Sequence, residues 1–63
     1  MIENKVRERR KALGRTLGQL SEASGLPVST LSDVERGMEP KVKTAQRIAW
    51  ALGRTVDELW PEP

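Results

Sequence analysis

The sequence predicts an all-α domain of five short helices, and three kinds of observation lead to this prediction. Apolar residues recur at helical spacing along the chain. Glycines follow the apolar stretches at places suited to ending a helix, and two segments have the form of an N-terminal capping box. The same reading yields no β-strand.

The first helix is expected over about residues 3–13. Ile2, Val6 and Leu13 have the spacing of one helical face, with arginines between them, and Gly14 follows as a C-terminal stop.

The second helix is expected from a capping box to Ser24. In this box the Thr16 hydroxyl accepts the amide of Gln19, and the Gln19 side chain returns to the Thr16 amide. Gly25 supplies the left-handed residue that ends the helix. Its apolar positions are Leu17, Leu20 and Ala23.

The third helix is expected over about residues 28–36. Pro27 suits a first helical turn, Leu31 and Val34 form a short apolar stripe, and Gly37 ends the helix. The turn of about three residues before it contains a glycine, which is typical of a helix-turn-helix, here about residues 16–36.

The fourth and fifth helices follow Pro40 and Gly53. The fourth carries the longest apolar stripe of the chain: Val42, Ala45, Ile48, Ala49 and Leu52. A second capping box, from Thr55 to Glu58, opens a last helix of one to two turns before Pro61. We expect the two tryptophans, Trp50 and Trp60, to pack against the core.

Length and composition exclude several classes of protein. The 63 residues suffice for one small domain, residues 1–63, whose core is thin because only 37% of them are hydrophobic. Without Cys or His, the chain lacks the groups for disulfides, zinc sites and Ser-His or Cys-His catalysis, so we expect no enzyme, metal or cofactor. The longest hydrophobic run, Ile48 to Leu52, is far shorter than the roughly 20 residues of a membrane span, which favours a soluble, cytoplasmic protein.

Charge is divided into blocks along the chain. The net charge is +4 over residues 1–15, −3 over 16–40, +4 over 41–54 and −3 over 55–63, which sums to +2. The two basic blocks either form one positive face for a polyanion or serve as ordinary solvated helix faces.

From Val6 to Trp60, the chain resembles the lambda-repressor and Cro type (XRE-like) of helix-turn-helix DNA-binding domain. The resemblance rests on the order and spacing of several weak motifs. They are Gly25 in the turn, Ser29-Thr30-Leu31-Ser32 with Val34-Glu35 and Gly37, Ile48-Ala49 with Ala51-Leu52-Gly53, and Asp57-Glu58-Leu59. It implies a compact five-helix lambda-repressor-like domain.

The resemblance also implies a set of functional residues. The third helix would lie in the major groove, with base readers Val28, Ser29, Ser32 and Asp33 and with Thr30 at the groove edge. Phosphate contacts would come from Thr16, Arg36, Lys41 and Lys43. Arg10 would pair with Glu35 as an exposed ion pair, orienting the arginine rather than holding the fold, and would also reach a phosphate. A homodimer interface would include Trp60 and Leu59.

The sequence departs from the family pattern at positions that affect DNA binding. Leu17 stands where many relatives have a phosphate-contacting Gln, and Pro27 replaces the usual polar cap of the third helix. That helix carries Asp33 and Glu35 but no Lys or Arg that would reach a base, so modest affinity or readout of DNA shape is expected.

Two functions follow from this interpretation. The first is a sequence-specific regulator that binds double-stranded DNA, most simply a small repressor acting as a homodimer on a palindromic operator. The second is a protein-interaction module, resembling an antitoxin or co-regulator, that keeps the fold with weak or no DNA binding.

Overall fold

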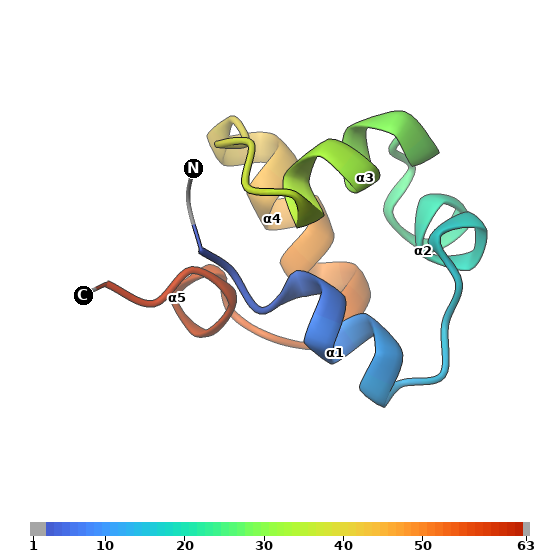
Figure 1. Cartoon of the computed structure of the whole chain (residues 1–63), viewed down its shortest axis with the longest axis horizontal. Coiled ribbons are helices and arrows are strands. Elements are labelled where there is room, and N and C mark those ends of the chain that lie inside the picture. Colours follow the sequence, from blue (N-terminus) through green and yellow to red (C-terminus); the bar gives the residue numbers. More distant parts are fainter. Residues whose placement is uncertain (1–2, 63) are drawn as a thin grey trace.

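Five α-helices follow one another in residues 3–62, the part of the chain that the computed structural model describes (Figure 1). They are α1 (Val6–Ala12), α2 (Leu17–Ser24), α3 (Val28–Glu35), α4 (Val42–Leu52) and α5 (Val56–Leu59). The predicted all-α class and the five-helix order are confirmed. Ile2, expected on the first helix, lies outside the described residues.

Both predicted capping boxes are present. At the start of α2, the Gln19 amide donates to Thr16 Oγ1 at 3.1 Å and the Thr16 amide donates to Gln19 Oε1 at 2.9 Å. At the start of α5, Thr55 and Glu58 make the same reciprocal pair. Each box satisfies amides that the first helical turn leaves without a partner.

The first helix is shorter than predicted. It begins at Val6, whose amide donates to Asn4 Oδ1 at 3.0 Å, and it ends at Ala12. The Asn4 side chain also donates to the Val34 carbonyl of α3 at 2.8 Å, so this residue joins two helices ahead of the first turn. Residues 3–5 are therefore a non-helical lead-in.

The core lies between α4 and the helices around it. α4 packs against α1, α2 and α5, and α3 packs against α1 and α2. The buried hydrophobic residues of the core are Val6, Leu20, Leu31, Val34, Ala45, Ile48, Ala49, Ala51, Leu52 and Leu59. None of the helices in residues 3–62 is long and apolar enough to cross a membrane.

Three apolar residues that we expected in the core are exposed. Val42 is 72% exposed because it is the first residue of α4 and projects beyond the packed turns. Trp50 is 78% exposed because it faces away from the side of α4 that buries Ala49 and Leu52. Leu13, at 39% exposed, comes after the last residue of α1. The prediction that Trp50 packs against the core is wrong.

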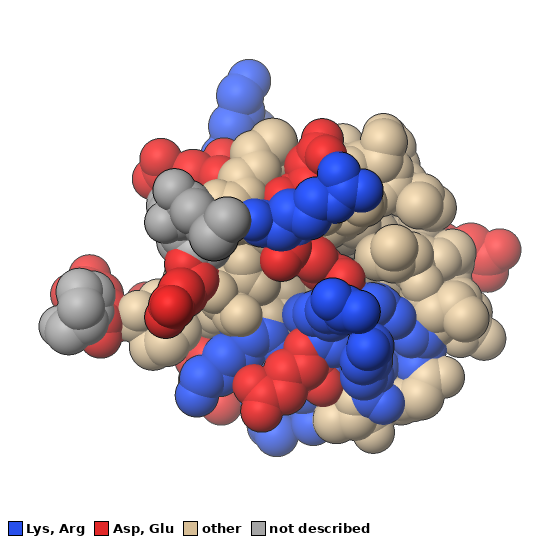
Figure 2. Space-filling view, viewed as in Figure 1, with Lys and Arg blue, Asp and Glu red and all other residues tan. Residues whose placement is uncertain are grey.

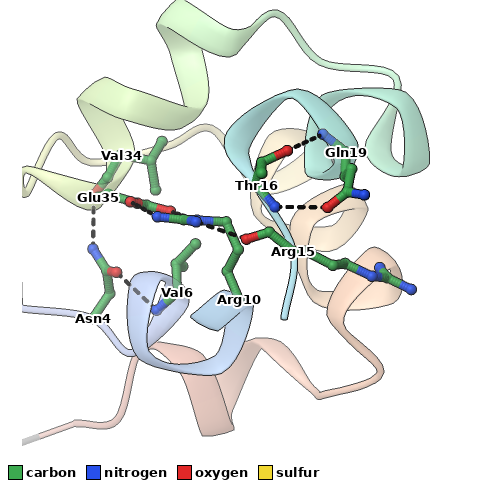
Figure 3. A network of polar contacts seen from close by, with 8 residues as sticks. All are labelled: Asn4, Val6, Arg10, Arg15, Thr16, Gln19, Val34 and Glu35. Atoms are coloured by element: carbon green, nitrogen blue, oxygen red, sulfur yellow. Dashed lines mark hydrogen bonds and ion pairs between the residues drawn. The ribbon is translucent and has the colours of Figure 1, made fainter. Parts of the chain in front are cut away.

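The most connected polar group of the fold is the guanidinium of Arg10, which is 8% exposed (Figure 3). Its Nε donates to Glu35 Oε2 at 2.7 Å and its Nη2 donates to Glu35 Oε1 at 3.1 Å. Its Nη1 donates to the Arg15 carbonyl at 2.8 Å. The hydrogen bonds with Glu35 outweigh the effect of burial and raise the pKa of Arg10. One side chain thus connects α1, α3 and the link between α1 and α2.

The pairing of Arg10 with Glu35 is as predicted, but its environment is not. We expected an exposed ion pair of small energetic weight, whereas the two side chains are 10% and 8% exposed. A buried pair of this kind holds the fold because the removal of one partner leaves an uncompensated charge out of water.

Two further arginines of the first basic block bind the end of α4. Arg9 Nε donates to the Leu52 carbonyl at 3.1 Å, and Arg15 Nη1 donates to the Ala51 carbonyl at 2.7 Å. The last turn of α4 has no basic residue of its own. These arginines therefore satisfy carbonyls and complement the negative end of the helix dipole.

Replacing Glu35 by Gln should destabilise the domain by about 3 kcal/mol, because Arg10 would keep its buried charge without a counter-charge. Asp33→Asn, on the same helix and exposed, should change stability by less than about 0.5 kcal/mol. Urea denaturation followed by circular dichroism measures both. Equal midpoints for the two variants would show that the pair does not hold the fold.

The capping box of α5 should respond to acid. Hydrogen bonds from the Thr55 amide and hydroxyl lower the pKa of Glu58 below its ordinary value. A lowered folded-state pKa contributes stability above the unfolded pKa, about 4.3, and this contribution is lost as the pH falls through the folded value. In an NMR titration, Glu58 should titrate below the ordinary range, and Thr55→Ala should raise its midpoint. An unchanged midpoint in the variant would assign the shift to another cause.

Candidate nucleic-acid interface

The third helix presents one continuous and largely polar surface away from the core. Leu31 and Val34 are fully buried, which fixes the rotation of α3 about its axis. The residues on the outer arc follow at helical spacing. They are Val28, Ser29, Ser32, Asp33 and the C-cap Arg36. In Figure 2 the surface over the start of α3 is mostly free of charged side chains.

The predicted base readers all lie on this arc. Val28 is 44% exposed, Ser29 and Asp33 are exposed, and Ser32 is half-buried. Thr30, predicted at the groove edge, is half-buried on the flank of α3. A hydroxyl can donate or accept, a Val side chain fits a thymine methyl, and a carboxylate can accept from cytosine N4. The arc therefore has groups that can contact base edges.

The predicted phosphate residues lie at the ends of three helices. Thr16 is the N-cap of α2, Arg36 is the C-cap of α3, and Lys41 is the N-cap of α4 with Lys43 following in its first turn. All four are exposed. The Thr16 hydroxyl accepts from Gln19, which leaves its own proton free to donate.

The starts of α2, α3 and α4 share an electrostatic feature that we did not predict from the sequence. None of the three has an acidic residue in its first turn, whereas α1 has Glu8 and α5 has Asp57 and Glu58 there. The positive end of each helix dipole is thus free of a competing carboxylate, which favours an anion at these three ends. A comparison of first turns would have revealed this in the sequence.

Arg10 does not lie at this surface. Its three guanidinium nitrogens donate to Glu35 and to the Arg15 carbonyl, and the residue is buried. The expected phosphate contact of Arg10 is therefore not supported by the geometry, because a phosphate would have to displace the bonds that join α1 to α3.

The expected dimer residues are also largely inside the domain. Leu59 is 1% exposed within the core. Trp60 packs against the core and is half-buried, and its indole Nε1 is buried without a hydrogen-bond partner among the described residues. The expectation that Trp60 packs against the core agrees with this placement. Leu59 has no surface to offer a second copy.

The first basic block does not form a uniform positive face. Arg9, Arg10 and Arg15 make the intramolecular bonds described above. In Figure 2, Lys and Arg side chains gather over α1 with Asp and Glu side chains between them. Sequence reasoning predicted the partner of Arg10 but missed the structural roles of Arg9 and Arg15, because their partners are backbone carbonyls 43 and 36 residues away.

Comparisons with known proteins agree on one family for this chain. A model of the helix-turn-helix family matches residues 6–59. The chain is 44% identical over 50 residues to an uncharacterised HTH-type transcriptional regulator of Methanothermobacter thermautotrophicus, a match that covers 78% of this chain and 72% of that protein.

Solved structures show the same arrangement of helices. The N-terminal DNA-binding domain of the biofilm regulator SinR from Bacillus subtilis has a TM-score of 0.83 and 30% identity, over 98% of this chain and 93% of that one. A chain of the SinR–SinI complex has a TM-score of 0.86 and 30% identity, over 98% of this chain and 62% of that one.

Proposed function

The chain belongs to the helix-turn-helix family of the lambda-repressor type, and on that premise we propose that it is a transcriptional regulator that reads double-stranded DNA with α3. The observation that carries this proposal is the outer arc of α3. Its rotation is fixed by Leu31 and Val34, and its tilt is held by the bonds of Glu35 to Arg10. A reading helix has to be rigid because a base contact depends on side-chain position.

In this proposal the N-terminal half of α3 enters the major groove. Ser29 and Ser32 make hydrogen bonds to base edges, Val28 contacts a thymine methyl, and Asp33 accepts from a cytosine amino group. Thr30 lies at the groove edge. Because Arg36 at the C-cap is the first basic residue of this segment, the bidentate arginine contact to guanine is not part of the proposed readout.

The phosphate contacts are proposed at the helix ends around α3. Thr16 and the free amides at the start of α2 hold one phosphate. Arg36, Lys41 and Lys43 hold the others from the opposite side of the reading helix. The absence of carboxylates in the first turns of α2 and α4 supports these positions.

A homodimer acting as a small repressor on a palindromic operator is the simplest form of this regulator. Dimers of such domains bind half-sites about 34–36 Å apart, one turn of DNA. The domain extends 29 Å along its longest axis, so two copies fit side by side on one face of the duplex. Since Leu59 is buried, the contact between copies has to use other residues, such as the exposed edge of Trp60. In this form, the bound dimer represses transcription by blocking polymerase. We place this activity in the cytoplasm.

A second candidate function is a protein-interaction module with weak DNA binding. The exposed carboxylate of Asp33 on α3 favours it, because a negative charge on the reading helix is repelled by the DNA phosphates. The similarity to a chain from a complex of SinR with SinI also supports a protein partner. Selection of duplexes from a randomised pool at low salt separates the two functions, since only the regulator enriches a sequence motif.

Changing Lys41 and Lys43 together to Ala should weaken binding about equally for all DNA sequences. The dependence of log affinity on log salt should become shallower by about 0.9 for each phosphate contact that is lost. Lys5→Ala with Lys11→Ala removes the same charge from the exposed side of the first basic block and is the control. If both pairs of changes reduce the slope equally, the effect comes from net charge and not from these contacts.

Replacing Ser29 by Ala should change the selected motif at particular base positions while the salt slope stays the same. The reason is that a base contact carries sequence information and a phosphate contact does not. Gln46→Ala, an exposed polar change on α4, should leave the motif intact. An identical motif for wild type and Ser29→Ala would remove Ser29 from the reading surface.

A further inference from the structure

The outward side of α4 carries two cations followed, one turn further along the helix, by an exposed tryptophan. Lys43, Gln46, Arg47 and Trp50 follow at positions i, i+3, i+4 and i+7, so they share one side of the helix, the outer stripe of α4. All four are exposed, and Trp50 is the most exposed large hydrophobic residue of the described chain at 78%. The stripe is opposite the face that buries Ile48 and Leu52.

The charge of the outer stripe is unbalanced. α4 contains no Asp or Glu, and within residues 3–62 no carboxylate lies at ion-pair distance from Lys43 or Arg47. By contrast, the exposed side of α1 alternates arginines with Glu8, and α5 carries Asp57 and Glu58. The outer stripe is thus a helix surface whose cations are available to a partner.

The side chain of Arg47 lies near the C-terminal end of α2. Its Nη1 lies 3.4 Å from the position that a Cβ on Gly25 would occupy, so the side chain covers the C-terminal end of α2. The negative end of that helix dipole favours a cation there.

We propose that the outer stripe of α4 is a docking surface for an acidic protein segment, in which an apolar side chain packs on Trp50 and flanking carboxylates bind Lys43 and Arg47. Tryptophan and arginine are the side chains most enriched among residues that dominate binding energy at interfaces. From Lys43 to Trp50 the stripe is about 10 Å long, which matches two turns of a partner helix. This inference goes beyond DNA binding, although the outer stripe shares Lys43 with the proposed phosphate contacts.

Charge also decides against a second copy of the chain on this surface. A two-fold contact places the same patch of both copies face to face. The outer stripe would then oppose two cations with two cations, and like charges across an interface are unfavourable. An acidic segment meets the same surface with complementary charge.

The probe for a test is a synthetic 14-residue helical peptide with Leu along one side and Glu on both flanks. A matched peptide has every Glu replaced by Gln. Amide chemical-shift mapping at low salt should show that the Glu peptide perturbs residues 43–50 and binds at least several-fold tighter than the Gln peptide. Binding of the Glu peptide should also weaken as salt is added.

Variants of α4 test the roles of individual side chains. Trp50→Ala should lower the affinity of the Glu peptide about tenfold, a typical effect for a central interface residue. Arg47→Gln should lower it by a smaller factor. The matched control is Val42→Ala, since Val42 is 72% exposed on the same helix but lies outside the stripe. Because Trp50 is exposed, the thermal midpoint of Trp50→Ala should equal that of the wild type.

Four results would overturn the proposal. The first is equal binding of the Glu and Gln peptides, or binding of neither. The second is a set of shifts centred on α1 or α3, and the third is a loss in Val42→Ala as large as in Trp50→Ala. The fourth is a loss of duplex DNA binding or of self-association in Trp50→Ala, which would assign the stripe to nucleic acid or to a second copy.

Discussion

The buried bond between Arg10 and Glu35 is the interaction on which the candidate function depends. It is the polar connection that fixes α3 to α1, and through the Arg15 carbonyl it also fixes the link that leads into α2. Apolar packing of Leu31 and Val34 sets which side of α3 faces outward. The ion pair fixes the position of α3 relative to α1. As a result, the outer arc and the helix ends around it form one surface.

The use of arginine for structure explains the distribution of charge. Three of the basic residues that precede α2 bind a carboxylate or backbone carbonyls inside the domain, and they are Arg9, Arg10 and Arg15. A chain with a thin core gains from these bonds because each one connects segments that are distant in sequence. The first basic block therefore has fewer free cations than its net charge suggests, and the proposed DNA contacts use cations near the ends of α3 and α4.

Much of the fold could be predicted from local sequence signals. The capping boxes at Thr16 and Thr55 and the left-handed Gly25 and Gly53 set helix ends within a few residues, so pattern and structure agree there. The exposure of Trp50 could not be predicted from its hydrophobicity, because burial depends on which side of α4 meets its neighbours. The burial of Arg10 could not be predicted either, because Glu35, its ion-pair partner, lies 25 positions away in the sequence. The choice of Val28, Ser29, Ser32 and Asp33 on α3 came from the family resemblance, whereas the acid-free first turns of α2, α3 and α4 could have been found by comparing the predicted helix starts.

The central claim is that the outer arc of α3, with the helix ends beside it, is the surface that binds duplex DNA. The most direct measurement is amide chemical-shift mapping of the labelled protein with a duplex enriched from a randomised pool. We expect perturbations in α3 from Val28 to Arg36, at the start of α2 and around Lys41 and Lys43. Perturbations centred on α1 or on the far side of α4, or no enriched duplex even at low salt, would contradict it.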